Sequence, residues 1–223
     1  MLLMMKMKKN DFLLNDKSGL RLRVQAFFTV ATIEYTGYLI INHFSEWRGE
    51  KYGHYFEPWT SIDHAIPFVP FFVIPYLLLL TLLVIPLIVV KSDERIRKGV
   101  EAYFGIILTS FAMFILVPMK MDRGDYISEV PETGVISGLV EWLWAVDPPY
   151  NTFPSLHVSL VCMATMIIYN ENKKYGMLMI LGAIMLTLST FLAKQHFIVD
   201  AIGGCILAWL WFKYYFLNKI ESI

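Results

Sequence analysis

Three short polar stretches contain the residue types that phosphate chemistry requires. They cover residues 120–123, 154–157 and 194–200. In the third stretch His196 and Asp200 are four positions apart, so on a helix they share one face. The carboxylate can then accept a hydrogen bond from one ring nitrogen of the histidine and leave the other nitrogen free as a base or nucleophile.

The second stretch places His157 two positions after Ser155, at the start of an apolar run. The N-terminus of a helix offers unpaired backbone N–H groups to an anion. Further donors of the kind that phosphate needs come from Lys120, Arg123, Ser155 and Lys194. Two histidines, a carboxylate and a basic surround together predict phosphoryl transfer.

Each of these residues could instead have a non-catalytic role. A lone histidine at a membrane boundary is usually an interfacial residue, and Lys120 and Arg123 could anchor lipid headgroups. Ser155 could simply cap a helix. Asp200 differs, because a carboxylate one turn inside an apolar span indicates function by default. Other polar residues receive no role: Glu34 lies well inside an apolar run, and Asp63 and His64 are expected in a solvated loop.

The composition indicates a membrane protein. Hydrophobic residues make up 57% of the 223 residues, charged residues only 17%, and the mean hydropathy is +0.53. These values exclude a soluble enzyme and a disordered chain. The formal net charge is zero, so nothing recruits nucleic acid. The two cysteines, Cys162 and Cys205, lie in apolar runs and predict neither a disulfide nor a metal site.

Six apolar stretches are long enough to be membrane-spanning helices, which predicts an all-α, six-helix bundle. They cover about 24–44, 66–90, 102–119, 154–169, 175–193 and 197–217. The second contains four prolines, so its outer third is expected to be kinked or to start late. In the fourth, Pro154 suits the first helical turn, with Asn151 or Thr152 as the cap.

The distribution of basic residues orients the bundle. Fourteen Lys and Arg residues lie before the first span, in the connections after the second and fourth spans, and at the C-terminal end. Five lie in the other connections. Basic residues gather on the cytoplasmic side, so both termini are expected in the cytoplasm. The three polar stretches then share one extracytoplasmic face. The expected organisation is a cytoplasmic segment 1–23, retained rather than cleaved as a signal peptide, a membrane domain 24–218 and a cytoplasmic tail 219–223.

Two motifs resemble the type 2 phosphatidic acid phosphatase superfamily. Residues 154–157, Pro-Ser-Leu-His, are similar to its second signature, Pro-Ser-Gly-His, with leucine in place of glycine. Its third signature is Ser-Arg, five residues, His, three residues and Asp. Here Ser189, His196 and Asp200 match, and Thr190 stands where the arginine would be. The first signature, a lysine followed by Arg-Pro, is represented only by Arg123 near Lys120.

Within that superfamily, the chain resembles the branch of inositol phosphorylceramide synthases and related bacterial proteins. The resemblance covers about residues 63–204 and rests on 147–157, on 194–196 and on the Pro-rich stretch 66–70. In this branch Lys194 is expected to replace the missing arginine, an inference from its chemistry and position.

The resemblance implies a six-helix lipid phosphatase or phosphotransferase that needs no metal or other cofactor. In that scheme His196 attacks phosphorus, Asp200 orients it and His157 protonates the leaving alkoxide. Lys120, Arg123, Ser155 and Lys194 would bind the phosphate. The substrate would be a lipid phosphate at the periplasmic or outer face of a plasma membrane, in a bacterium by analogy.

Several alternatives stay open on the sequence. Water as acceptor would give hydrolysis, whereas a lipid or polyol hydroxyl would give transfer. A divalent-metal hydrolase could instead use His157, His196 and Asp200 as ligands, and a lipid-binding or transport protein would use the same basic pocket without turnover. Oligomeric state, headgroup and chain length are not specified.

Overall fold

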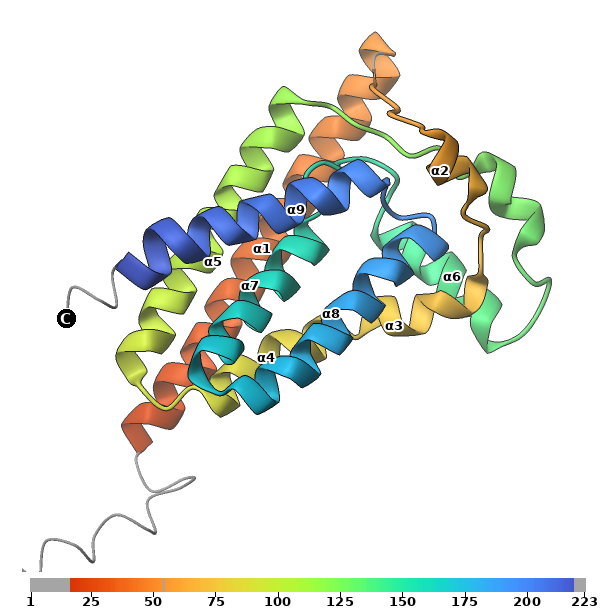
Figure 1. Cartoon of the computed structure of the whole chain (residues 1–223). Helices are drawn as coiled ribbons and strands as arrows, with labels where there is room; N and C mark the ends of the chain where they lie inside the picture. Colours follow the sequence, from red (N-terminus) through yellow and green to blue (C-terminus); the bar gives the residue numbers. More distant parts are fainter. Residues whose placement is uncertain (1–16, 54, 219–223) are drawn as a thin grey trace, which may run out of the picture.

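A computed structural model describes residues 17–53 and 55–218, and it is built of helices joined by short connections. Figure 1 shows their arrangement. In chain order the helical segments are α1 (Lys17–Tyr52), α2 (Ser61–Ala65), η1 (Pro70–Phe72), α3 (Val73–Leu77), α4 (Leu79–Val89), α5 (Asp93–Leu116), η2 (Gly124–Glu129), α6 (Val135–Val146), α7 (Leu156–Glu171), α8 (Lys173–Leu192), α9 (Ile198–Trp211) and the π-helical η3 (Phe212–Leu217).

Among the described residues, five helices are long and apolar enough to cross a membrane. They are Gly19–Tyr52, Pro70–Val89, Asp93–Leu116, Lys173–Leu192 and Ile198–Leu217. These match five of the six predicted spans. The remaining one, 154–169, corresponds to α7, whose 16 residues extend about 24 Å. The sidedness of the termini stays a prediction, and most of the two proposed terminal segments, 1–16 and 219–223, lies outside the described residues.

The first part of the second span is interrupted, as the sequence predicts, whereas Pro86 lies inside the continuous helix α4. Pro70 begins the short helix η1, and the backbone breaks again between α3 and α4 at Leu78. At the outer end the N–H of Val69 donates to the carbonyl of Leu192, 2.8 Å away. This bond ties the segment before α3 to the end of α8.

The predicted start of α7 was wrong by two residues. Ser155 is the N-cap, and its hydroxyl accepts a bond from the N–H of Val158 at 3.3 Å. Asn151 does not cap the helix, because its backbone has a φ of +58° and its side chain points elsewhere. Its amide oxygen accepts from the hydroxyl of Ser45 at 2.6 Å, and its amide nitrogen donates to Asn42. The loop before α7 is therefore tied to α1.

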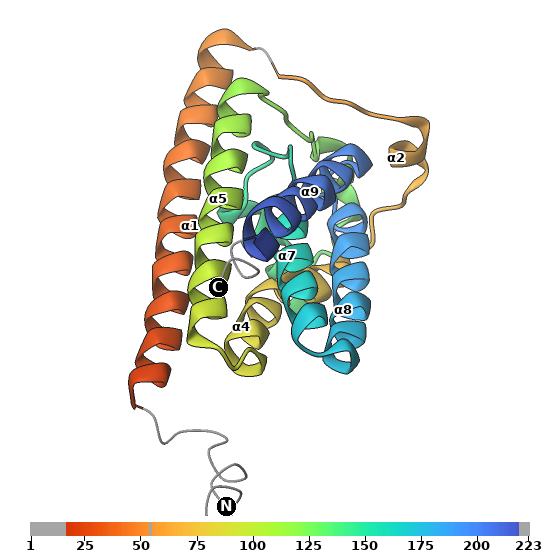
Figure 2. The ribbon, with the colours of Figure 1, turned by 60° about the vertical axis from the view of Figure 1, so that its left-hand side comes forward.

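Helix α7 lies at the centre of the bundle and contacts α4, α5, α8 and α9 (Figure 2). It crosses α9 closely at Gly204. A Cβ atom at that position would lie 2.7 Å from the carbonyl oxygen of Ser155, a distance that real Cβ atoms essentially never show. The glycine therefore permits the contact that brings the start of α7 against α9, in line with the close packing that small residues allow between membrane helices.

The segment 120–153, which connects the third and fourth predicted spans, contains two helices. These are η2 and the twelve-residue α6, which packs on α3 and η1. A small apolar cluster joins them: Phe68, Val73, Tyr76, Val140 and Leu143. The cluster positions the C-terminal end of α6, and with it Asp147, beside the start of α7.

Candidate active site

Two histidines face each other at the end of the bundle where α7 and α9 begin. His157 is the second residue of α7, and His196 lies in the turn between α8 and α9. Their ring centroids are 5.7 Å apart, with the rings at 61°. The N–H of Ser155 donates to the carbonyl of Asp200 at 3.0 Å, which fixes the start of α7 against α9. The structure thus brings the three predicted catalytic residues together.

Asp200 lies behind His196 and is fully buried. Its Oδ2 is 3.4 Å from Nδ1 of His196 and accepts a bond from the N–H of Phe197 at 2.9 Å. The carboxylate therefore caps its own helix and faces the imidazole at once. The His196 contact is within ion-pair distance, although its geometry is not that of a hydrogen bond, as is common in unliganded active sites.

Arg123 is buried and directs its guanidinium at protein acceptors. Nε donates to the carbonyl of Lys194 at 3.0 Å, one terminal nitrogen to the carbonyl of Asp147 at 2.8 Å, and the other to Oε1 of Gln195 at 2.6 Å. Burial lowers the pKa of Arg123, and the charge of Asp147 opposes that change. Arg123 therefore holds the turn before α9 to the end of α6.

Lys194 also binds protein groups. Its φ is +53°, and its Nζ donates to the carbonyl oxygens of Ile66 at 2.6 Å and Asp63 at 3.3 Å. The ammonium lies 4.7 Å from the ring centroid of Tyr126. Burial lowers the pKa of Lys194, while Asp63 and Glu129 act to raise it. The lysine thus bridges the turn before α9 to the segment that leads into α3.

The other two predicted phosphate ligands differ in exposure. Ser155 is buried as the cap of α7, with its hydroxyl used by the backbone of its own helix. Lys120 is more accessible, and its Nζ lies 3.6 Å from Asp122. Residues 119–123 run beside 147–151, since the N–H of Met121 donates to the carbonyl of Pro149. Ser155 precedes His157 by two residues and Lys194 precedes His196 by two, and a role of all four residues in phosphate binding stays a prediction.

Three residues that the sequence left without a role are linked to His157 by a chain of hydrogen bonds. The hydroxyl of Tyr76, from α3, is 2.8 Å from Nε2 and 3.1 Å from Nδ1 of His157. It also donates to Oδ2 of Asp147 at 2.6 Å, and the hydroxyl of Tyr38, from α1, donates to Oδ1 at 2.5 Å. Asp147 stood inside the motif 147–157, whereas the tyrosines lie in apolar runs that give no signal of a polar partner.

Asp63 is buried rather than solvated, so the expectation of a solvated loop was wrong for it. Only 4% of the residue is exposed. Its Oδ1 accepts from the N–H of Ile198 at 2.9 Å, the first residue of α9, and Oδ2 accepts from the backbone and hydroxyl of Thr60. His64 is exposed and stacks on Trp59. Asp63 therefore anchors α2 to the helix that carries Asp200.

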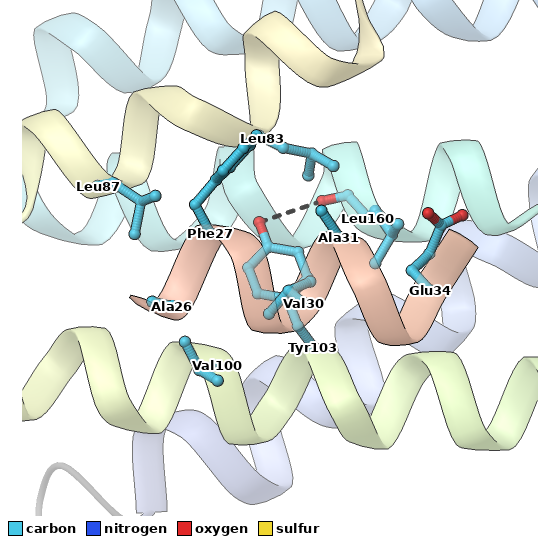
Figure 3. Close-up of a pocket in the computed structure, with 10 residues that line it drawn as sticks. All are labelled: Ala26, Phe27, Val30, Ala31, Glu34, Leu83, Leu87, Val100, Tyr103 and Leu160. Carbon is cyan, nitrogen blue, oxygen red and sulfur yellow. Dashed lines mark hydrogen bonds between the residues drawn. The ribbon is translucent and has the colours of Figure 1, made fainter. Parts of the chain in front are cut away.

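An apolar cavity of about 60 Å³ lies between α1, α4, α5 and α7 (Figure 3). Glu34 contributes a carboxylate to a wall that is otherwise formed by apolar side chains and Tyr103. The hydroxyl of Tyr103 donates to the carbonyl of Leu160 at 3.5 Å. None of the residues that line this cavity belongs to the histidine site.

The cysteines and the acidic groups do not form a further site in the part of the chain that the structure describes. The Sγ atoms of Cys162 and Cys205 are 3.6 Å apart and both cysteines are free. Within residues 17–53 and 55–218, no group of three or more His, Cys, Asp or Glu side chains is arranged to hold a metal ion.

The fold and the site define a helical membrane protein with paired histidines at one end of its bundle. A model of the PAP2 superfamily, the type 2 phosphatidic acid phosphatases, matches residues 53–214. The chain belongs to this superfamily, and membership supports a phosphatase or phosphotransferase activity in general. Comparison with curated proteins and with solved structures gave no match.

Proposed function

We propose that the protein is a membrane lipid phosphatase or phosphotransferase that works through a phosphohistidine on His196. The observation that carries this proposal is the arrangement of two facing imidazoles with a buried carboxylate behind one of them. His157 and His196 are 5.7 Å apart between ring centroids, and Asp200 is 3.4 Å from His196. A phosphoryl group between the rings would meet a nucleophile on one side and a proton donor on the other.

The chemistry proceeds in two steps. In the first, the ring nitrogen of His196 that does not face Asp200 attacks phosphorus, and the bond from phosphorus to the leaving oxygen breaks. His157 gives a proton to that oxygen. In the second, an acceptor hydroxyl attacks the phosphohistidine while His157 takes its proton back. Asp200 supports the positive charge that develops on His196.

The phosphate itself would be held by donors near the two rings. Lys120 is the most accessible of the predicted ligands. Ser155 and the first N–H groups of α7 lie beside His157. Charged and backbone donors placed before the reaction stabilise the additional negative charge of the transition state. Arg123 and Lys194 act on this site through the turn that carries His196.

The substrate class and location follow from the resemblance. The substrate would be a phospholipid or lipid diphosphate, taken from the extracytoplasmic leaflet of a plasma membrane, in a bacterium by analogy. The motif 147–157 favours the inositol phosphorylceramide synthase branch, in which the acceptor is a hydroxyl of a second lipid or polyol rather than water. Incubation with phosphatidate, prenyl diphosphate and phosphatidylinositol, with product analysis by mass spectrometry, separates hydrolysis from transfer.

Trapping the covalent intermediate tests the proposal. Substrate with labelled phosphorus should leave label on the purified protein that is lost in acid and stable in base, because a phosphoramidate bond breaks in acid. His196→Ala should abolish the label, and Asp200→Asn should reduce its rate of formation.

Two other outcomes would overturn the proposal. A metal hydrolase would lose turnover to chelators and carry no label. A lipid-binding protein would bind phospholipid normally after His196→Ala, and neither the wild-type protein nor the variant would form product.

A further inference from the structure

A buried carboxylate stands behind each of the two histidines, but the two are connected differently. Asp200 faces His196 directly, at 3.4 Å. Asp147 reaches His157 through the hydroxyl of Tyr76, which lies 2.6 Å from the carboxylate and 2.8 Å from the nearer ring nitrogen. Asp147 begins the motif 147–157, whereas Tyr76 and Tyr38 lie outside the family motifs.

The hydrogen bonds of this group have a defined direction. Tyr76 and Tyr38 each have one hydroxyl proton, and both donate to Asp147, at 2.6 Å and 2.5 Å. Both oxygens of the carboxylate are thereby occupied. Because Tyr76 gives its only proton to Asp147, it can only accept from His157. The hydroxyl lies within 3.1 Å of both ring nitrogens of His157, so it can accept a hydrogen bond from a protonated imidazole.

The charge of Asp147 is maintained in its buried position. Burial alone would raise the pKa of Asp147, but His157, Arg123 and the two tyrosine hydroxyls together hold it below its ordinary value. The charge of Asp147, one hydroxyl away, favours the protonated form of the His157 imidazole and so opposes burial, which favours the neutral ring. The groups that face His157 are Tyr76 from α3, Asp147 from the end of α6 and His196 from the turn before α9.

We propose that Tyr76, Asp147 and Tyr38 form a positioning network that holds His157 as the proton donor of the reaction. Tyr38 fixes Asp147, Asp147 fixes Tyr76, and Tyr76 orients the ring of His157. During the first step the proton passes from His157 to the leaving oxygen as the phosphorus bond forms at His196, and the tyrosine protons stay where they are. The network therefore orients His157 and supplies a nearby negative charge, and none of its own groups gains or loses a proton. This inference rests on the proposed function.

A network with only a structural role would behave differently. It would connect α1, α3 and α6, and its loss would lower turnover on all substrates by the same factor. A group that serves the proton donor matters most where the leaving group is a poor one. An aryl phosphate leaves without much help from an acid, whereas a lipid alkoxide needs a proton. The ratio of the two rates distinguishes these roles.

The test compares Tyr76→Phe with the wild-type protein on a lipid phosphate and on an aryl phosphate. Turnover on the lipid phosphate should fall by about 10- to 100-fold, in the range of general acid catalysis, and turnover on the aryl phosphate by less than about threefold. Asp147→Asn should shift the ratio in the same direction, and Tyr38→Phe should do so more weakly. Labelled phosphohistidine should still form from the aryl substrate.

Tyr103→Phe is the matched control, because Tyr103 is also buried and its hydroxyl binds only a main-chain carbonyl, that of Leu160. It should leave the rate ratio unchanged. Thermal unfolding of each variant identifies any that fail to fold, and Tyr38→Phe and Asp147→Asn then carry the test. Equal losses on both substrates would overturn the network while leaving the phosphohistidine mechanism intact. Absence of product and label from the wild-type protein would overturn the mechanism and the network together.

Discussion

Arg123 shows how a residue can serve a phosphate site while its guanidinium nitrogens donate to protein groups. The family resemblance makes it a phosphate ligand, yet three of its nitrogens bind Lys194, Asp147 and Gln195. All three partners belong to segments that flank a histidine. The guanidinium of Arg123 therefore holds the turn before α9 in place.

Replacement of Arg123 by alanine should affect both activity and stability. Turnover should fall by about one to three orders of magnitude, because the turn that carries His196 loses the donors that position it. The carbonyl groups left without a donor should lower the free energy of unfolding by about 1–3 kcal/mol. Initial rates and thermal unfolding in detergent measure the two effects. Lys51→Ala, which changes an exposed residue of α1, is the control. A wild-type rate for Arg123→Ala would exclude a role for Arg123 in turnover.

Asp147 should make the protein sensitive to acid. Its folded-state pKa lies below the ordinary value of 3.8, so its contribution to stability is complete above the unfolded-state pKa and is lost as the pH falls through the folded-state pKa. Asp147→Asn lacks this contribution. The difference in unfolding temperature between the two proteins should therefore be constant near neutral pH and shrink below about pH 4. Parallel curves down to pH 3 would contradict the assignment.

At the scale of the helices, the contact between α7 and α9 places the starts of the two helices side by side, where the N–H of Ser155 donates to the carbonyl of Asp200. It depends on Gly204, where a Cβ would lie 2.7 Å from the carbonyl of Ser155 and 3.2 Å from the hydroxyl of Ser159. These neighbours are backbone and a short side chain, which cannot move aside without displacing α7. The contact therefore fixes the separation of the two helices.

Gly204→Ala should separate α7 from α9 and destabilise the protein by about 1–3 kcal/mol, the usual cost of overpacking. Turnover should fall as well, because the histidine pair loses its spacing. Gly138→Ala provides the comparison: Gly138 lies in α6 with nothing within 4 Å of an added Cβ. That change should stabilise the helix by up to about 1 kcal/mol. Similar unfolding temperatures for the two variants would argue against close packing at Gly204.

The sequence predicted the long elements better than the contacts between them. Hydropathy located the spans because a membrane demands long apolar helices, and the prolines located the break in the second one. It missed α6, because twelve residues in a connection are too short for a hydropathy argument. It missed Tyr38 and Tyr76, since their polar partner Asp147 is 109 and 71 residues away in the chain.

The motifs give the candidate site only in part. The motifs place four residues at the starts of two helices: Ser155, His157, His196 and Asp200. These residues converge because the two helix starts pack together. The roles of Arg123 and Lys194 could not be predicted in the same way. Whether a long basic side chain reaches solvent or a buried carbonyl depends on loops 55–69 and 193–197, whose path no local pattern specifies.

For the whole molecule, the two ends of the bundle should lie on opposite sides of a membrane. Glu132 precedes α6, and Asn172 lies in the turn between α7 and α8. Both residues are exposed, so a cysteine at either position is accessible to a probe. The proposed orientation puts the histidine pair and position 132 outside the cytoplasm.

Cysteine labelling tests that orientation. Single cysteines at 132 and 172 are introduced into a chain that lacks Cys162 and Cys205. A membrane-impermeant thiol reagent applied to intact cells should label position 132 and leave 172 unlabelled, since basic residues gather on the cytoplasmic side. Permeabilised cells, in which both positions should react, are the control. Labelling of 172 alone in intact cells would place the site in the cytoplasm.

The order of the helices along the chain has a consequence for synthesis. Tyr38 lies on the first helix, Tyr76 and Asp147 follow in the chain, and His196 and Asp200 come only with the turn before α9 and α9 itself. In the proposed mechanism, a nascent chain that has not yet released α9 from the ribosome would contain the proton donor but not the nucleophile in its place. We therefore expect such a chain to be inactive towards the lipids around it until the complete bundle has assembled.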